Sequence, residues 1–295
     1  MPFGQITIIG TGLIGGSLAL ALRQGGFQGK IIGSDRPEVL GRAKRMGAIS
    51  EGFADPIEAS SHSDVIVLAT PVGAIIELLS RLGPHLDGDS LVTDVGSTKS
   101  EIVSAAAKVF GDRMDKNFLP GHPMAGKESS GIESADPGLF RGATWFLTPV
   151  SGRMPATGAG RKFVSCLRGT GAKIRVLDAR EHDQLCAWIS HVPQMIATAL
   201  AASLVDEYGE QAPLLESGGR ALEEMTRIAA SPYSMWRDIA LTNKTFIADR
   251  LLKLEQRLAH LRENLDTREL AEEFERAHKL RPGKLRPGRR GKTDA

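Results

Sequence analysis

Hydrophobic and polar positions divide the chain into two halves with different periodicity. In the first half, short apolar runs rich in β-branched residues predict strands at residues 5–10, 30–34, 64–69, 90–95 and 173–177. Helical patterns lie between them, around residues 18–22, 75–82 and 102–109. Strands that alternate with helices predict a doubly wound parallel sheet of the α/β class.

The second half, beyond Asp178, is helical in pattern throughout, and a Gly/Pro-rich bridge at residues 149–160 precedes the last predicted strand. Near the end, leucines and one isoleucine recur at alternating intervals of four and three residues, as in the heptad seam of one long helix: Ile247, Leu251, Leu254, Leu258, Leu261 and Leu265. Such a seam needs a partner, either another helix of this chain or a second copy. We predict a nucleotide-binding α/β domain at residues 1–178, a helical domain at 179–280 and a tail at 281–295.

The composition is that of a globular protein, with 41% hydrophobic and 24% charged residues among 295. Only two cysteines occur, Cys166 and Cys186, and no signal-like segment precedes the first strand, so we expect a cytoplasmic protein without disulfides. No apolar run approaches the roughly 18–20 residues of a spanning helix, so no membrane role is expected. No metal site is predicted.

The basic charge is concentrated in the tail. Seven Lys and Arg residues against Asp294 give residues 279–295 a net charge of +6, which leaves −4 for residues 1–278 of the total of +2. A tandem Lys-Leu-Arg-Pro-Gly with few apolar residues indicates a disordered, solvated appendage. Contact with nucleic acid or an acidic partner is the alternative interpretation.

A glycine-rich turn connects the first strand to the first helix. In Gly10-Thr11-Gly12-Leu13-Ile14-Gly15, the first glycine makes the turn and the second lets a pyrophosphate approach the backbone. Gly15 allows close packing of the helix, whose N-terminus faces the phosphate charge. The turn, with Leu13 and Ile14, predicts a dinucleotide site. The alternative is a glycine-rich turn of another α/β domain.

The second strand ends in Asp35, twenty residues after Gly15. A carboxylate at that position hydrogen-bonds the adenosine ribose hydroxyls and repels a 2′-phosphate, which favours NAD over NADP. Arg36 could stack on adenine or accommodate a phosphate, so NADP stays open.

Ligands of doubly wound sheets bind outside the carboxyl ends of the strands. Thr70 and Pro71 follow the third predicted strand, where they line the nicotinamide side or form an ordinary turn. Ser97 and Thr98 follow the next strand and could cap the helix beginning near Lys99. A hydroxyl there could also orient a substrate oxygen.

His122 lies in Gly121-His122-Pro123-Met124-Ala125-Gly126-Lys127-Glu128. The glycines and the proline predict a fixed, exposed turn. A histidine can take a proton near neutral pH. The alternatives for His122 are a surface or packing role.

Four strings together resemble the prephenate/arogenate dehydrogenase family of tyrosine biosynthesis: DVGSTK at 94–99, GHPMAGKESSG at 121–131, SHVPQ at 190–194 and MTRIAASPYSMWRDI at 225–239. The resemblance covers residues 4–280. It implies oxidation of a ring carbinol by hydride transfer to nicotinamide, with loss of the ring carboxylate as CO2. It also implies a homodimer formed through the helical domain.

The resemblance implies roles for individual residues. His122 would be the general base for the ring hydroxyl, with Ser97 hydrogen-bonded near the same oxygen. Arg227 would hold a substrate carboxylate through its guanidinium fork. On the sequence alone, Arg227 would instead form a helix ion pair with Glu223 or Glu224.

Five further positions belong to the same resemblance. His191 would be a substrate-side histidine; the alternative is a core histidine, because it lies within an apolar helical face. Lys127 and Glu128 would order a loop over the site; the alternative is that both lie on the surface. Trp236 would be an apolar wall near the ring, and Arg237 a supporting residue. Gln194 departs from relatives that carry a second histidine there, which leaves the choice between prephenate and arogenate open.

No segment long enough for a fused mutase or a regulatory domain is found, so a stand-alone dehydrogenase is expected, inhibited by tyrosine only through the active site. Two alternatives remain at this stage. One is a β-hydroxyacid or imine reductase of similar two-domain architecture. The other is a nicotinamide-sensing binding protein without turnover, which predicts salt-sensitive nucleic-acid binding through the tail.

Overall fold

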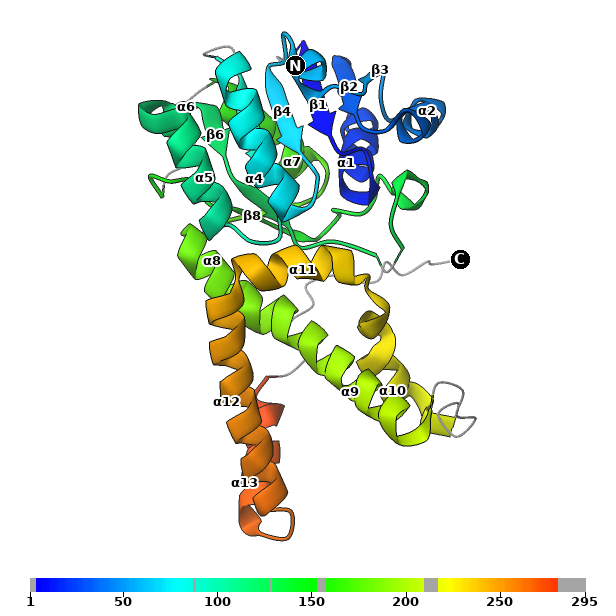
Figure 1. The fold of residues 1–295 in the computed structure, drawn as a ribbon, viewed down its shortest axis with the longest axis vertical. Coiled ribbons are helices and arrows are strands. Elements are labelled where there is room, and N and C mark those ends of the chain that lie inside the picture. Colours follow the sequence, from blue (N-terminus) through cyan, green and yellow to red (C-terminus); the bar gives the residue numbers. More distant parts are fainter. Residues whose placement is uncertain (1–3, 87–88, 128, 153–157, 210–216, 281–295) are drawn as a thin grey trace, which may run out of the picture. The chain divides into compact units, whose positions relative to one another are not determined.

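A computed structural model describes residues 4–86, 89–127, 129–152, 158–209 and 217–280 (Figure 1). The chain separates into two compact units, Met1–Lys244 and Thr245–Ala295. The predicted basic tail at 281–295 lies outside the described residues.

The larger unit is built on a six-stranded parallel sheet. Its strand order is β3-β2-β1-β4-β5-β6, so the chain winds outward from β1 in both directions, as the alternation of strands and helices predicts. The strands are β1 (Gln5–Ile9), β2 (Lys30–Ser34), β3 (Glu51–Phe53), β4 (Val65–Leu68), β5 (Leu91–Asp94) and β6 (Phe118–Leu119). Four of them confirm predicted runs.

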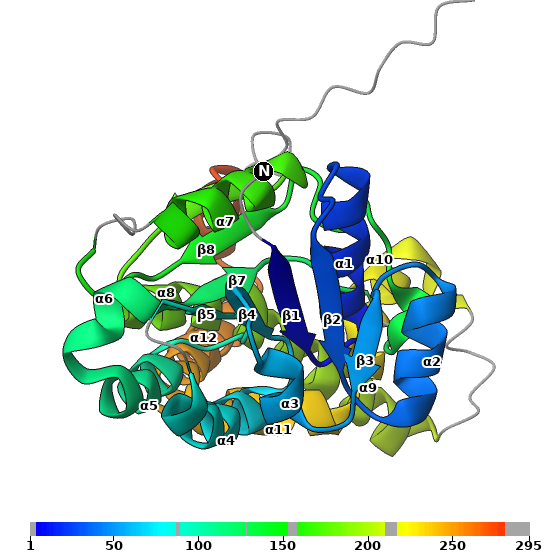
Figure 2. The same ribbon diagram turned by 90° about the horizontal axis from the view of Figure 1, so that it is seen from above.

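Helices cover both faces of this sheet (Figure 2). On one face, α1 (Leu13–Gln24) and α7 (Gly158–Gly169) pack on Val65 and Val67 of β4. On the other, α4 (Val72–Leu82) and α5 (Ser100–Phe110) pack on Ile66 and Leu68. Successive residues of a strand point to opposite faces, so a continuous apolar run such as β4 is buried on both sides. Two short helices, α2 (Pro37–Arg45) and α3 (Pro56–Ser60), lie between β2 and β4 in the sequence.

A second sheet has the order β7-β8-β9, with β7 (Gly121–Pro123), β8 (Thr144–Leu147) and β9 (Lys173–Val176). β7 pairs antiparallel with β8, and His122 lies opposite Phe146. The prediction of an exposed turn around His122 was therefore wrong, because pairing with β8 turns this segment into a buried strand. The predicted bridge at 149–160 was also too long, since α7 begins at Gly158.

Beyond β9, the described residues of the larger unit are mostly helical, as predicted. Asp178 starts α8 (Ala179–Cys186) with a capping box shared with Glu181, and a π-helical turn at Ala187–His191 leads into α9 (Val192–Tyr208). Then follow α10 (Gly219–Thr226), a 3-10 turn at Arg227–Ala230 and α11 (Tyr233–Thr242). Single π-helical turns inside α-helices are frequent at functional sites.

The helix Ala179–Tyr208 is long and apolar enough to cross a membrane by length and composition. The prediction that no run reaches this threshold was wrong, because no Asp, Glu, Lys or Arg occurs between Ala187 and Val205. The same helix carries His182, Asp183 and His191, which are all buried within the folded unit. Core helices of soluble proteins pass the same test.

The smaller unit is a helical hairpin. α12 (Lys244–Glu263) and α13 (Arg268–His278) are joined by ion pairs from Arg257 to Glu273 at 2.7 Å and from His260 to Glu269 at 3.4 Å. The predicted single helix through Leu265 was wrong. The Asn264 amide donates to the His260 carbonyl at 2.9 Å, and a new helix begins after the Thr267 cap.

Candidate active site

The glycine-rich turn follows β1 and opens α1. Gly10 has a φ of +93°, a conformation that favours glycine. A Cβ at Gly15 would lie 2.0 Å from the Gly10 carbonyl oxygen, so only glycine allows the helix to pack this closely. A Cβ at Gly12 would have no neighbour within 4 Å in the part of the chain that the structure describes, and the φ of −77° at Gly12 suits any residue. The fold therefore requires the first and third glycines, whereas Gly12 leaves space for a group that approaches the backbone.

A cleft of about 460 Å³ lies beside this turn at the carboxyl ends of β1 and β2. Four of the predicted cofactor residues line it together: Gly10, Asp35, Arg36 and Thr70. The Asp35 carboxylate accepts hydrogen bonds from the Thr11 N–H at 2.8 Å and the Arg36 N–H at 2.8 Å. These bonds hold the carboxylate at the end of β2, where it can accept hydrogen bonds from ribose hydroxyls.

A second cleft, of about 380 Å³, continues from Thr70. Its walls include further residues predicted from the sequence: Leu13, Ile14, Pro71, Ser97 and Lys127. Four residues around the start of α11 close another side: Ser231, Pro232, Ser234 and Met235. Segments far apart in the sequence thus meet at the carboxyl end of the parallel sheet, the place where such sheets bind ligands.

His122 is buried in β7, with 7% of its surface exposed. Its Nδ1 lies 2.9 Å from Nε2 of His182, and His182 Nδ1 lies 2.9 Å from Oδ1 of Asp183. A carboxylate only accepts, so His182 donates through Nδ1 and accepts at Nε2. His122 must then donate through Nδ1, which leaves the proton-free Nε2 as the basic atom of its ring. Asp183 and His182 together select this tautomer.

Both histidines are neutral at pH 7. Burial lowers the pKa of His122 well below its usual 6.5, and the nearby His182 and Lys99 lower it further. Burial also lowers the pKa of His182, although the hydrogen bond to Asp183 opposes that shift. Neutral His122 can therefore accept a proton.

A buried ion pair fixes the strand that carries His122. Lys99 and Asp94 are both fully buried; Lys99 Nζ donates to Asp94 Oδ2 and, at 2.8 Å, to the Gly121 carbonyl. The Gly121 N–H donates to the other oxygen of Asp94 at 3.2 Å. Asp94 ends β5, so His122 is tied to the same edge of the sheet as the clefts.

Asp183 also caps α5. Its two carboxylate oxygens accept the N–H groups of Lys99 at 2.7 Å and Ser100 at 2.8 Å. The predicted capping by Ser97 and Thr98 was wrong: a carboxylate from a distant helix fills that place, and the Thr98 hydroxyl bonds Thr242 at 2.8 Å. Asp183 thus connects the start of α5 to His182.

His191 is almost fully buried at the π-helical turn. The Asn243 amide donates to His191 Nδ1 at 3.0 Å and to the Asp183 carbonyl at 2.9 Å. His191 therefore carries its proton on Nε2, a buried donor that has no hydrogen-bond partner among the described residues. Trp236 packs edge to face on its ring, with centroids 6.0 Å apart. An unpaired buried donor costs free energy unless a ligand satisfies it.

The remaining predicted residues lie on surrounding loops and helices. Arg227 is exposed at the end of α10, and Lys127 pairs with Asp136 at 3.2 Å. Arg237 pairs with Asp238 at 3.0 Å, and Asp238 accepts the Gly73 N–H at the start of α4. Glu128 lies outside the described residues.

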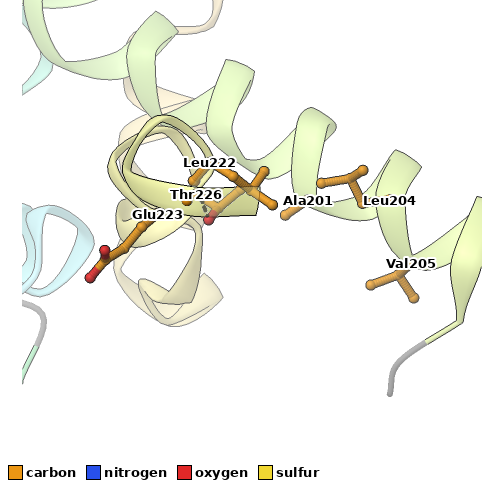
Figure 3. Close-up of a pocket in the computed structure, with 7 residues that line it drawn as sticks. Ala201, Leu204, Val205, Leu222, Glu223 and Thr226 are labelled. Carbon is orange, nitrogen blue, oxygen red and sulfur yellow. Dashed lines mark hydrogen bonds between the residues drawn. The ribbon is translucent and has the colours of Figure 1, made fainter. Parts of the chain in front are cut away.

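A separate groove of about 470 Å³ runs between α9 and α10 (Figure 3). Ala201, Leu204 and Val205 of α9 face Leu222 and Thr226 of α10 across it, and Glu223 stands at its edge. Its walls are mostly apolar, and none of the predicted site residues that the structure describes lines it.

Comparison with known proteins shows the family to which the chain belongs. The family model "Prephenate dehydrogenase, nucleotide-binding domain" matches residues 18–176, and "Prephenate dehydrogenase, dimerization domain" matches residues 178–279. The chain belongs to the prephenate dehydrogenase family. Membership of this family argues against both alternatives left open by the sequence, which were a hydroxyacid or imine reductase and a binding protein without turnover.

Several relatives of the chain are similar over most of its length. It is 34% identical to a prephenate dehydrogenase of Lactococcus lactis over 284 residues, which covers 94% of this chain and 76% of the relative. The crystal structure of prephenate dehydrogenase from Aquifex aeolicus with hydroxyphenyl propionate and NAD+ superimposes with a TM-score of 0.85 at 32% identity, covering 97% of this chain and 99% of that one. Synechocystis arogenate dehydrogenase gives a TM-score of 0.75 at 28% identity, covering 95% and 99%.

Sequence reasoning missed four residues of the histidine network: Asp94, Lys99, His182 and Asp183. Asp94 and Lys99 stood inside the quoted string DVGSTK, and the adjacent His-Asp pair at 182–183 was the remaining signal. Asn243, which orients His191, had no signal of its own.

Proposed function

We propose that this protein catalyses the NAD-dependent oxidative decarboxylation of prephenate, arogenate or both. The observation that carries the proposal is the chain of hydrogen bonds from Asp183 through His182 to His122, which presents a neutral imidazole with a basic Nε2 in a member of this family. Oxidation of a ring alcohol needs an acceptor for the hydroxyl proton.

In this mechanism, His122 Nε2 accepts the ring hydroxyl proton as the hydride leaves. His182 and Asp183 stabilise the resulting cation, because the His122 Nδ1–H then points to a neutral ring that is itself bonded to a carboxylate. Ser97, on the cleft wall, would orient the same oxygen. Bound NAD supplies the hydride acceptor, and loss of CO2 makes the ring aromatic.

Substrate anchoring is assigned to Lys127, which lines the second cleft, and to Arg227, His191 and Trp236, which do not line it. Arg227 would grip a carboxylate, and the unpaired Nε2–H of His191 would donate to another polar group of the substrate. Trp236, held against His191, would form an apolar wall, and Lys127 and Glu128 would order the neighbouring loop. Arg237 supports this wall through Asp238.

The cofactor cleft fits NAD. Gly12 leaves space for a pyrophosphate, and the Asp35 carboxylate lies where ribose hydroxyls would bind and a 2′-phosphate would be repelled. Leu13, Ile14, Thr70 and Pro71 would continue the site toward the nicotinamide. Arg36 leaves room for some activity with NADP.

The proposal is tested by the initial rate of nicotinamide reduction with prephenate and with arogenate, each offered NAD and NADP. We expect turnover with at least one substrate and higher kcat/KM with NAD. Absence of turnover with all four pairs would refute the proposed reaction.

Gly12→Ala should separate cofactor binding from folding. Apart from its neighbours in the chain, the added methyl group meets no atom of the described residues within 4 Å, so we expect a change in unfolding free energy below about 1 kcal/mol but an NAD Kd at least tenfold higher. Gly15→Ala is the matched control, in which the clash with the Gly10 carbonyl should destabilise the fold by about 1–3 kcal/mol. Calorimetric NAD titration and urea unfolding measure both effects, and unchanged NAD affinity in Gly12→Ala would contradict the assignment.

Arg227→Ala should mainly raise KM, because a carboxylate anchor binds the ground state and transition state alike. A charged hydrogen bond contributes about 1.5–3 kcal/mol, so KM should rise roughly 10- to 100-fold. Arg227→Lys should have a KM between those of the unchanged protein and Arg227→Ala, because lysine keeps the positive charge but cannot grip a carboxylate with two parallel hydrogen bonds. Arg220→Ala, in the preceding helix α10, is the control, and an unchanged KM in Arg227→Ala would return Arg227 to a structural role.

The assembly is proposed to be a homodimer through the helical domain, 179–280, in a cytoplasmic protein without nucleic-acid or membrane partners. The match to a dimerization domain and the apolar groove between α9 and α10 support this arrangement. A monomeric mass by light scattering at micromolar concentration would contradict it.

A further inference from the structure

Three potential metal-ligand atoms face one another, and one of them belongs to His122, the proposed base. His122 Nδ1 lies 2.9 Å from His182 Nε2, and Cys186 Sγ lies 3.3 Å from His182 Nε2 and 3.9 Å from His122 Nδ1. All three side chains are buried, and their donor atoms lie within 4.8 Å of one another. Cys186 has no part in the proposed reaction, so its place in this cluster is unexplained by catalysis.

The spacing suits a tetrahedral ion. Zn–N bonds of about 2.0–2.1 Å and Zn–S bonds of about 2.3 Å place tetrahedral ligands about 3.4–3.6 Å apart, so each observed separation is within roughly 0.5 Å of that required. Two imidazoles and one thiolate are donors that zinc and cobalt accept, and three protein ligands leave a fourth position for water.

The surroundings also resemble those of a metal site. His182 donates its Nδ1–H to Asp183, the carboxylate–histidine arrangement that orients metal-bound imidazoles. Lys99, Asp94 and Asp183 give the buried surroundings a net charge of −1, and a dication with one thiolate would bring it to zero. Neutralising buried charge removes a large desolvation penalty. His122, with 7% of its surface exposed against 0% for His182 and Cys186, is the most accessible of the three ligands.

We propose that His122, His182 and Cys186 form an inhibitory site for a borderline transition-metal dication such as Zn²⁺. Binding forms two metal–nitrogen bonds and one metal–sulfur bond, and the Cys186 thiol releases its proton to solvent. The proton on His122 Nδ1 moves to Nε2, so the ring can no longer accept the substrate proton. The ion therefore lowers kcat by fixing the wrong tautomer of His122.

Binding and inhibition are measured separately, because the inhibition rests on the proposed function whereas binding does not. Co²⁺ titrated into the full chain under anaerobic conditions should give thiolate-to-cobalt charge-transfer absorption and the visible bands of four-coordinate cobalt, with a stoichiometry of one per chain. Saturating Zn²⁺ should lower kcat at least tenfold, and a chelator should restore it. Absence of the charge-transfer band would overturn the site whether or not the enzyme turns over prephenate; the band without turnover would leave the site and remove the proposed reaction.

Cys186→Ala removes one donor and should keep the basal kcat. We expect it to abolish the charge-transfer band and to raise the inhibitory Zn²⁺ concentration at least about 100-fold. Losing a group that only hydrogen-bonds a metal ligand lowers metal affinity about 10- to 100-fold, and losing a ligand should lower it more. Cys186→Ser keeps the volume of the side chain and serves if the alanine variant unfolds. The control, Cys166→Ala, changes the half-buried cysteine of α7 and should leave both readouts unchanged. Equal Zn²⁺ inhibition of the Cys186 variants and the unchanged protein would refute the proposal.

Discussion

His122→Asn should lower kcat by roughly 100-fold or more, the usual contribution of a positioned base. Asparagine can still donate to His182 Nε2, so the buried acceptor keeps a partner. It has no basic atom to take the hydroxyl proton. Affinity for NAD should stay unchanged, because His122 lines neither of the two clefts that hold most of the predicted cofactor residues.

Steady-state kinetics and calorimetric NAD titration distinguish this outcome from misfolding. His85→Asn, at an exposed histidine, is the matched control and should behave as the unchanged protein. A near-normal kcat in His122→Asn would remove His122 from the role of base and with it the mechanism proposed here.

Asp183→Asn should lower kcat by roughly 10²- to 10⁴-fold, with a much smaller effect on KM. The carboxylate accepts three hydrogen bonds, from His182 and from the N–H groups of Lys99 and Ser100, and an amide must present a donor to one of them. If the amide donates to His182, both imidazoles reverse their tautomers and His122 Nε2 gains the proton. In a serine protease triad the equivalent change lowers kcat about 10⁴-fold through the wrong tautomer.

Loss of the negative charge acts in the same direction, since no carboxylate then stabilises the cation formed at His122. Asp183 is thus a positioning residue, and its effect must be separated from its capping of α5. Asp178→Asn changes the cap of α8, also an aspartate, without touching the histidines, and asparagine is an equally good cap. Urea unfolding measures the stability of both variants, and steady-state kinetics separate the effects on kcat and KM. A normal kcat in Asp183→Asn, or an equal loss of kcat in Asp178→Asn, would show that Asp183 has a structural role only.

Local patterns predicted the framework well. The strands β1, β2, β4 and β5 are short runs dominated by β-branched and other apolar residues, and nearly all of their residues are buried, as expected for strands covered by helices on both faces. The turn from Gly10 to Gly15 was recognised for the same kind of reason, since its conformation depends on residues adjacent in the chain.

Contacts between distant segments were beyond such patterns. Asp183 caps a helix that begins 83 positions earlier, and His122 meets His182 across 60 positions. Neither side chain carries a local signal of its partner. The end of α12 before Leu265 was missed because heptad spacing continues through a turn that Asn264 and Thr267 stabilise.

The sequence by itself determined the α/β architecture, the nucleotide turn and the candidacy of His122, because apolar periodicity and glycine conformation act over a few residues. Only the tertiary structure decided which nitrogen of His122 is basic, how Asp183 and His182 select it, and that Cys186 lies beside both rings. The physical reason is that a tautomer is set by hydrogen-bond partners, and here those partners come together only when α8 packs on the carboxyl end of the folded sheet.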